Sequence, residues 1–436
     1  MNRPKLSESV RGVLDRRRFL IAAGTLLLAP AYAQERREPA RFASALPISG
    51  SALEGIPVST PEAQGFDSAR LAAMTRFIES TSEPTFSMMI ARNGHIVYEM
   101  LAGDLPRDAA HYLMSVTKSL TSAITGAAID RSLIASEDQP IGELLPNELF
   151  GSPENLEDKR RITVRQVLNM SALDVPHIVG NTDPEARKNY SGWVEAKNRV
   201  RYALAQRKVH QPMGVMNYTD LNCSLMNGII HYRSRKTALD FANEHLFSRM
   251  GFRNQEWMGQ DPEGIELGGY GLRLRPLDML KFGQLYLQRG SWNGQSLLNP
   301  AWIDKAYVSQ VSPRHDMRYF YSGYSNYWWH GRHRGAKNIM ASGWKGQRIS
   351  VFPEENLVVT HTGVIENLEA RYYDELISRH VLYAMRGSSL PENPAAFSDL
   401  LAALGRMREK DLRLDAVEPR MRPEARNKEK RKPWRA

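Results

Sequence analysis

The sequence predicts an α+β fold in which an antiparallel sheet, flanked by helices, receives strands from both ends of the chain. On the N-terminal side, Asn93-Gly94 separates two short alternating runs, which is typical of a tight hairpin. On the C-terminal side, the strand-like runs 348–352 and 357–360 flank the turn-like segment 353–356. Between these ends, from about residue 140 to 267, the sequence is mostly helical. We therefore expect an inserted all-helical lobe between two contributions to one sheet.

Helices are also expected beside this sheet. Apolar residues recur at three- and four-residue steps over 66–79, and a second helix begins near Ser115. Another helix ends at Gly290, a residue typical of helix C-termini, and one more covers 370–385.

The positive charge of the chain lies in two appendages. The 436 residues carry a net charge of +10, with 42% hydrophobic and 24% charged residues. Residues 1–33 hold +4 and residues 417–436 hold +5, which leaves +1 for the body. A nearly neutral body does not favour nucleic-acid binding. The tail, 417–436, has few apolar residues and is expected to be disordered, and nucleic-acid or acidic-surface binding by this tail stays an open alternative. We place the main domain at 57–390 and a C-terminal helix at 391–416.

The N-terminus resembles an export signal. An arginine pair at 16–17 precedes an apolar run at 21–29 that is too short to span a bilayer, and an A-x-A site ends at Ala33. The pattern predicts a twin-arginine-type signal peptide over 1–33, followed by a linker over 34–56. The mature protein would be periplasmic or secreted, with no stable membrane anchor after cleavage. A general secretory peptide or an uncleaved anchor is the alternative.

One nearly chargeless helix carries the clearest chemical signal. From Ser115 to Ile129 the only charged residue is Lys118, three positions after the serine. Residues i and i+3 share a helix face, so the hydroxyl and the amine can touch. Burial disfavours the charged amine, and a neutral amine can take the proton of a serine nucleophile. A lysine that reaches out to solvent is the alternative.

Two further segments could complete such a centre. Tyr218 precedes an apolar helix and can relay a proton to a leaving group, although most tyrosines only pack. The glycine-rich ASGWKGQ, at 341–347, precedes a strand that can present a backbone N–H to a substrate. A second S-x-x-K lies here, from Ser342 to Lys345, and we reject it because i and i+3 point to opposite faces of a strand.

Five segments, in this order, resemble the serine β-lactamase/penicillin-binding superfamily. They are MSVTKSLTSAITGAAID, RITVRQVLNMSALD, PMGVMNYTDLNCSLMNGIIH, GGYGLRLRPLDMLKFGQLYLQRGSWNG and ASGWKGQRISVFPEENLVV. The resemblance covers roughly 57–385 and is closest to the class C-like branch, which includes the 6-aminohexanoate-dimer (nylon-oligomer) hydrolases and related carboxylesterases. It implies a β-lactamase/transpeptidase-like fold.

The resemblance also implies roles for individual residues. Ser115 matches the nucleophile, Lys118 the general base, and Tyr218 the tyrosine of the family's Y-x-N element. Ala341-Ser342-Gly343 occupies the place of the family's K-T-G or H-T-G triplet. Trp344 would supply the second oxyanion N–H, beside that of Ser115.

Two departures from the family pattern bear on the substrate. Asp220 stands where the family often has asparagine, so an amide contact to the substrate is in doubt. Ala341 stands where β-lactamases and DD-peptidases have a cation, which argues against penicillins or D-Ala-D-Ala peptides. A rival triplet, 361–363 (HTG), ends the following strand, and we interpret it as a decoy.

These observations predict an exported serine hydrolase that cleaves a small-molecule ester or unstrained amide through an acyl-enzyme. No cofactor is expected, and no metal either, since arginines at 332 and 334 adjoin the pair His330 and His333. A non-catalytic penicillin-binding-like protein and a true β-lactamase or DD-peptidase are the alternatives. The sequence alone gives no oligomeric state.

Overall fold

A computed structural model describes residues 50–151, 156–175, 184–206, 216–313, 321–365, 369–410 and 412. The predicted signal peptide, most of the predicted linker and the predicted basic tail lie outside the described residues.

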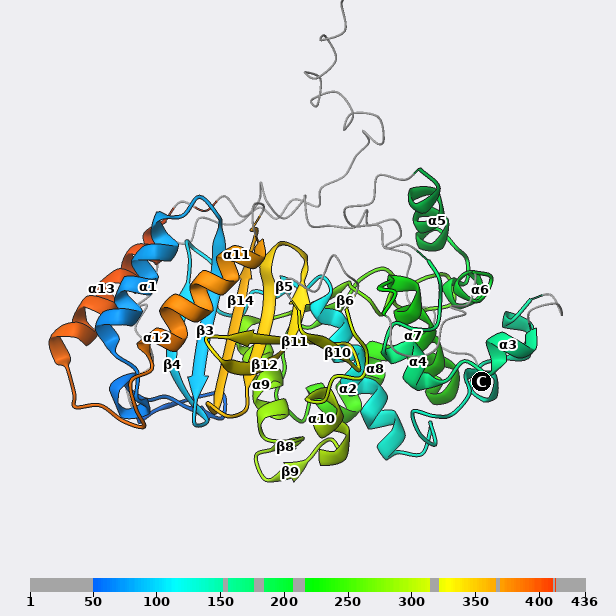
Figure 1. The fold of residues 1–436 in the computed structure, drawn as a ribbon, viewed down its shortest axis with the longest axis horizontal. Coiled ribbons are helices and arrows are strands. Elements are labelled where there is room, and N and C mark those ends of the chain that lie inside the picture. The colour runs from blue at the N-terminus through cyan, green and yellow to red at the C-terminus, as the bar shows by residue number, and fades with distance from the viewer. Residues whose placement is uncertain are drawn as a thin grey trace, which may run out of the picture. The chain divides into compact units, whose positions relative to one another are not determined.

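A seven-stranded antiparallel sheet is the main scaffold, in the order β10-β11-β12-β13-β14-β3-β4 (Figure 1). Strands from the N-terminal side therefore pair directly with strands from the C-terminal side, as predicted. The strands are β3 (Thr85–Arg92), β4 (His95–Leu101), β10 (Gly323–Ser325), β11 (Trp328–His333), β12 (Ala336–Gly343), β13 (Gln347–Phe352) and β14 (Leu357–Gly363). Shorter strands are β1 (Ala52–Leu53), β2 (Ile56–Pro57), β5 (His111–Tyr112), β6 (Glu256–Trp257), β7 (Leu272–Leu274), β8 (Ser291–Trp292) and β9 (Gln295–Ser296).

The predicted hairpin joins β3 to β4. Asn93 and Gly94 both have positive φ angles, +50° and +77°, which the two central residues of a type I′ turn require. Ile90 and Val97 lie in these strands with no exposed surface. The sheet therefore carries core on both of its faces.

Helices cover both faces. On one face, α1 and α13 pack together, and Thr75 of α1 shares a 2.9 Å hydrogen bond with the Tyr98 hydroxyl of β4 (Figure 1). On the other face, α9 contacts β3, β13 and β14, and α2 contacts β12. Gly283 permits this contact, because a Cβ there would lie 2.4 Å from Val358. The helices are α1 (Ser68–Ser80), α2 (Val116–Asp130), α9 (Pro276–Leu287), α10 (Pro300–Ala306), α11 (Glu369–Asp374), α12 (Leu382–Ala384) and α13 (Pro394–Glu409), with a π-helical stretch at Glu375–Val381.

The predicted helical lobe lies between β5 and β7 in the chain. Its central helix, α7, is buried along most of its length and contacts α2, α4, α6 and α8. The helices are α3 (Leu156–Arg160), α4 (Val164–Leu168), α5 (Pro184–Val194), α6 (Arg199–Leu204), α7 (Asp220–Ser234) and α8 (Ala238–Ala242). Among the described residues, no helix has both the length and the apolar character needed to cross a membrane. The α+β fold expected from the sequence is confirmed.

A buried ion network ties the N-terminal β1–β2 ribbon to α9. The Glu54 carboxylate accepts hydrogen bonds from Arg275 and Lys281, each 2.9 Å long. Arg275 also donates to Asp278, at 2.7 Å. The Arg275 guanidinium is the main cause that lowers the pKa of Glu54 to about 2, so this carboxylate stays charged at neutral pH.

Candidate active site

Ser115 stands at the N-terminus of α2. Its own backbone is helical (φ −70°, ψ −4°), whereas Met114 before it has φ +50°, a left-handed conformation that is uncommon for a non-glycine residue. The Val116 N–H donates to the Leu113 carbonyl at 3.1 Å and closes a tight turn around the serine. The Ser115 side chain therefore lies at the positive end of the helix dipole.

The buried side-chain nitrogen of Lys118 has three polar neighbours within 3.0 Å. Its ammonium nitrogen lies 3.0 Å from Ser115 Oγ, 2.5 Å from Asp220 Oδ1 and 2.9 Å from the Gly269 carbonyl oxygen. Lys118 is only 1% exposed, so the alternative of a lysine reaching into solvent is wrong.

The pKa of Lys118 shifts in the direction opposite to the one expected from burial alone. Burial lowers the pKa of Lys118, but the Asp220 carboxylate raises it, and the net shift is upward. A carboxylate in direct contact stabilises the ammonium form more than burial destabilises it. Asp220, at the third position of the Y-x-N element, forms an ion pair with this lysine.

Tyr218 lies beside the same lysine. The Lys118 nitrogen is 4.8 Å from the centroid of the Tyr218 ring. Burial raises the pKa of Tyr218 to about 12, although the Lys118 charge and a hydrogen bond with Ser115 act to lower it. The structure thus brings the three predicted catalytic residues together, with the phenol protonated at neutral pH.

A stack of aromatic rings joins Tyr218 to the neighbouring strand. Trp329 stacks on Tyr218 and on Tyr321, with ring centroids 5.4 Å and 4.1 Å apart. The Tyr321 hydroxyl in turn shares a 3.1 Å hydrogen bond with Ser342 Oγ on β12. This stack fixes the orientation of the Tyr218 ring relative to β12.

The end of β12 approaches Ser115 through its backbone. A Cβ at Gly343 would lie 2.4 Å from the Leu113 carbonyl oxygen, two residues before Ser115. Next comes the turn Trp344–Gly346, in which Trp344 is 46% exposed. The predicted triplet and the predicted oxyanion residue therefore lie next to the segment that carries the serine.

The second S-x-x-K differs from the expectation. Lys345 does not lie in a strand but in the turn after β12, with φ +60°. Its nitrogen lies 4.9 Å from the Trp344 ring centroid, and Ser342 bonds to Tyr321.

The sequence reasoning missed the glycine-rich loop before β7. Gly269 offers its carbonyl to Lys118, and a Cβ there would lie 2.6 Å from the Asp220 carboxylate. A Cβ at Gly268 would lie 2.3 Å from the Cys223 carbonyl oxygen. The double glycine in GGYG is the signal that could have identified this loop as a close neighbour of the site.

The cysteine and the possible metal ligands are the remaining reactive groups. Cys223 is a buried free cysteine, and burial raises its pKa to about 12, so it is a thiol at neutral pH. Within the described part of the chain, no group of three or more His, Cys, Asp or Glu side chains could hold a metal ion.

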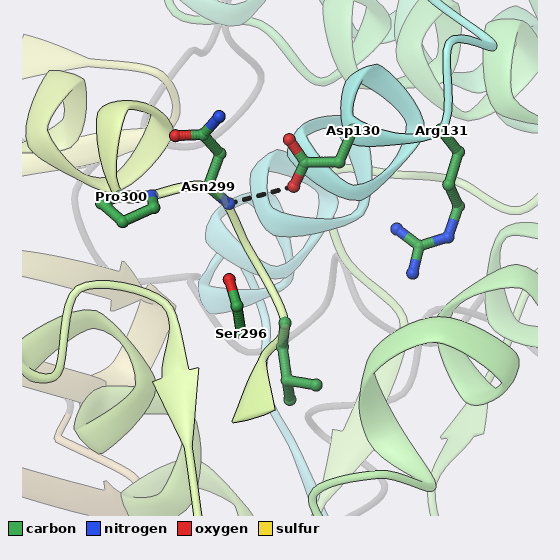
Figure 2. Close-up of a pocket in the computed structure, with 6 residues that line it drawn as sticks. Asp130, Arg131, Ser296, Asn299 and Pro300 are labelled. Carbon is green, nitrogen blue, oxygen red and sulfur yellow. Dashed lines mark hydrogen bonds between the residues drawn. The ribbon is translucent and has the colours of Figure 1, made fainter. Parts of the chain in front are cut away.

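A surface pocket lies at the opposite end of α2. It is lined by Asp130, Arg131, Ser296, Leu297, Asn299 and Pro300, and the Asp130 carboxylate accepts a 3.0 Å hydrogen bond from the Asn299 N–H (Figure 2). A helix of 15 residues is about 22 Å long. The pocket is therefore separate from the Ser115 site.

Comparison with known proteins identifies the class. The model of the β-lactamase family matches residues 72–362, which is more than half of the chain. The chain belongs to this family, and it is a serine hydrolase. The resemblance inferred from the five sequence segments is confirmed.

Individual relatives agree with this class. A 6-aminohexanoate-dimer hydrolase from Paenarthrobacter ureafaciens is 22% identical over 331 residues, which cover 73% of this chain and 81% of that protein. A D-stereospecific amidohydrolase from Streptomyces sp. has a TM-score of 0.56 at 14% identity, covering 72% and 98% of the two chains. The hydrolase EstCE1, described with promiscuous acyltransferase activity, has a TM-score of 0.57 at 15% identity, covering 73% and 99%.

Proposed function

We propose that this protein is an exported hydrolase that cleaves a small-molecule ester or unstrained amide through an acyl-enzyme on Ser115. The 3.0 Å contact between Ser115 Oγ and the buried nitrogen of Lys118 carries this proposal. A serine becomes a useful nucleophile only when a neighbouring group can take its proton.

The charge on Lys118 determines how that proton leaves. An ammonium group has no free electron pair, so Lys118 can accept the serine proton only as it gives one of its own to Asp220. The 2.5 Å separation makes this second transfer short. As Ser115 Oγ bonds to the carbonyl carbon, its proton moves to Lys118, a lysine proton moves to Asp220, and the carbonyl oxygen becomes an oxyanion.

Tyr218 completes the cycle. When the bond to the leaving group breaks, the phenol gives its proton to the departing oxygen or nitrogen. Lys118 then reprotonates Tyr218, and Asp220 returns the proton to Lys118. Water releases the acyl group by the same steps in reverse order.

Two backbone N–H groups are proposed to bind the oxyanion. One belongs to Ser115 and the other to Trp344. Trp344 directly follows Gly343, whose backbone lies close to the Leu113 carbonyl. Donors that are already oriented toward a developing charge commonly supply about 3 kcal/mol of transition-state stabilisation each.

Two features near the site support the proposed substrate class. Ala341 is fully buried and offers no cation at the triplet position, while Trp344 is exposed beside the turn. These features favour an ester or unstrained amide over a β-lactam whose carboxylate would need a cation at the triplet position. The names of the relatives, which include an amidohydrolase, agree with this choice. The predicted twin-arginine leader supports export to the periplasm or beyond.

A fluorophosphonate probe tests the proposal directly. We expect the wild-type protein to be labelled and Ser115→Ala to remain unlabelled. A screen of p-nitrophenyl esters, short amides and linear ω-amino acid oligomers would then define the substrate. Equal labelling of both proteins would place the nucleophile elsewhere, and rapid hydrolysis of a chromogenic cephalosporin would favour a true β-lactamase.

A further inference from the structure

The turn Trp344–Gly346 is hydrogen-bonded to buried side chains that have no part in the proposed mechanism. We propose that His361 and Tyr373 are positioning residues that hold this turn, and with it the Trp344 N–H, in the geometry that binds the oxyanion. The catalytic consequence of this inference rests on the proposed function, whereas the structural part does not.

The turn needs outside support because of its backbone. Lys345 and Gly346 both have positive φ angles, +60° and +95°. A non-glycine residue in the left-handed region costs of order 1 kcal/mol and persists only where its surroundings require it. The conformation of this turn must therefore be stabilised by contacts outside the turn itself.

The Gly346 carbonyl oxygen receives two hydrogen bonds. His361 Nδ1 lies 2.8 Å from it, and the Tyr373 hydroxyl donates to it at 2.6 Å. Because a carbonyl oxygen can only accept, His361 must carry its proton on Nδ1. Its Nε2 then accepts from the Thr85 hydroxyl, 3.1 Å away, which fixes the ring in this tautomer.

The other two carbonyls of the turn are also bonded. The Ile365 N–H donates to the Lys345 carbonyl at 3.0 Å, and the Gln347 amide donates to the Trp344 carbonyl at 3.4 Å. The same Gln347 amide donates to the Gly363 carbonyl at 2.8 Å. The Lys345 and Gly346 carbonyls are thus bonded to Ile365, just after β14, and to His361 of β14 and Tyr373 of α11, while the Trp344 carbonyl is bonded to Gln347 at the start of β13.

The HTG segment at 361–363 does not lie where the family triplet would face a substrate. His361 is 1% exposed and its two ring nitrogens are both occupied, so it is directed into the protein interior and not at a substrate. Burial lowers the pKa of His361 to about 4, so the neutral, Nδ1-protonated ring persists at physiological pH.

The test measures the turn and the chemistry separately. Tyr373→Phe removes one donor to Gly346, and His361→Leu removes the other, whereas His361→Asn keeps an N–H near the Nδ1 position. Tyr98→Phe is the matched control, because it removes a buried hydroxyl whose 2.9 Å partner, Thr75, lies away from the turn. Each protein is assayed for the rate of fluorophosphonate labelling, for kcat and KM on an ester, for Tm, and for amide hydrogen exchange in the peptide covering 343–347.

We expect Tyr373→Phe and His361→Leu to slow labelling and lower kcat by about tenfold or more, with little change in KM, since a displaced donor weakens only transition-state binding. Exchange in the 343–347 peptide should rise in both variants. His361→Asn should recover much of the rate, and Tyr98→Phe should lose Tm without losing rate.

Wild-type rates and unchanged exchange in Tyr373→Phe and His361→Leu would overturn the inference. A different result, in which the wild-type protein is not labelled at Ser115, would overturn the proposed function, and exchange in the peptide would still decide whether these residues hold the turn.

Discussion

The two S-x-x-K segments share one pattern and occupy two different backbones. Ser115 and Lys118 lie on one turn of α2, where their side chains meet at 3.0 Å in the protein interior. Ser342 is the penultimate residue of β12 and bonds to Tyr321, and Lys345 follows in a left-handed turn beside Trp344. A spacing of three residues therefore defines a catalytic pair only when a helix brings both positions to one face.

Replacing each serine should give the largest difference in activity between the two S-x-x-K segments. Ser115→Ala should reduce kcat/KM for the best ester found by about 10⁴-fold or more, because the nucleophile is lost. Ser342→Ala removes only the hydroxyl bonded to Tyr321 and should change kcat/KM less than about tenfold. Steady-state kinetics on both variants gives the comparison, and a Ser342→Ala variant as inactive as Ser115→Ala would reverse it.

The two lysines should differ almost as strongly. Lys118→Met should lower kcat by about 10³-fold and also lower Tm, because it leaves the Asp220 carboxylate buried without its ammonium partner. Lys345→Met should affect both quantities only slightly. The double variant Lys118→Met/Asp220→Asn separates stability from chemistry, since it should recover Tm but not kcat. A double variant with restored kcat would contradict the role of Lys118.

Asp220 stabilises the charged form of Lys118, and this ion pair distinguishes Lys118 from Lys345. Asp220→Asn removes the group that raises the pKa of Lys118 and leaves burial, which lowers it. In this variant Lys118 has no carboxylate to receive its proton and must be neutral to accept the serine proton, so kcat/KM should gain a rise with pH that the wild-type profile lacks. Asp304→Asn, which alters an exposed ion pair with Arg289, is the control and should keep the wild-type profile. An unshifted profile in Asp220→Asn would show that the ion pair does not control the base.

The smallest effect is the pH dependence of stability, to which His361, bonded to the turn of the second segment, contributes. Burial lowers the pKa values of His111, His330 and His361 to about 4, from 6.5. Below pH 6.5 the unfolded chain binds these protons while the folded protein does not, so their contribution to stability is complete above pH 6.5 and falls toward pH 4. Tm should drop by about 5 °C or more between pH 7 and pH 5. His361→Asn should reduce the dependence of Tm on pH. A Tm that does not change between pH 7 and pH 5 would contradict the claim that these histidines are buried in their neutral form.

Local patterns in the sequence were sufficient for the sheet, the helical lobe and the Ser115–Lys118 pair. The Asn93-Gly94 turn and the helical spacing after Ser115 are decided by neighbouring residues, so a single sequence reveals them. The placement of Tyr218 came from the resemblance and not from spacing.

The charge of Lys118 could not be predicted from neighbouring residues in the sequence. Its partners, Asp220 and Gly269, lie 102 and 151 positions away in the sequence, and one of them is a backbone carbonyl. The left-handed Lys345 was missed because nothing in its residue type signals positive φ, which is more common for glycine or asparagine. Contacts at long range and backbone atoms are the two features that the sequence pattern does not encode.

Gly343 limits how this protein can vary at the end of β12. Its backbone angles suit any residue, yet even a methyl group would collide with the Leu113 carbonyl oxygen. Any larger residue at this one place would push the strand away from the segment that carries Ser115, so the space between two backbones, and not the backbone conformation, restricts this position to glycine.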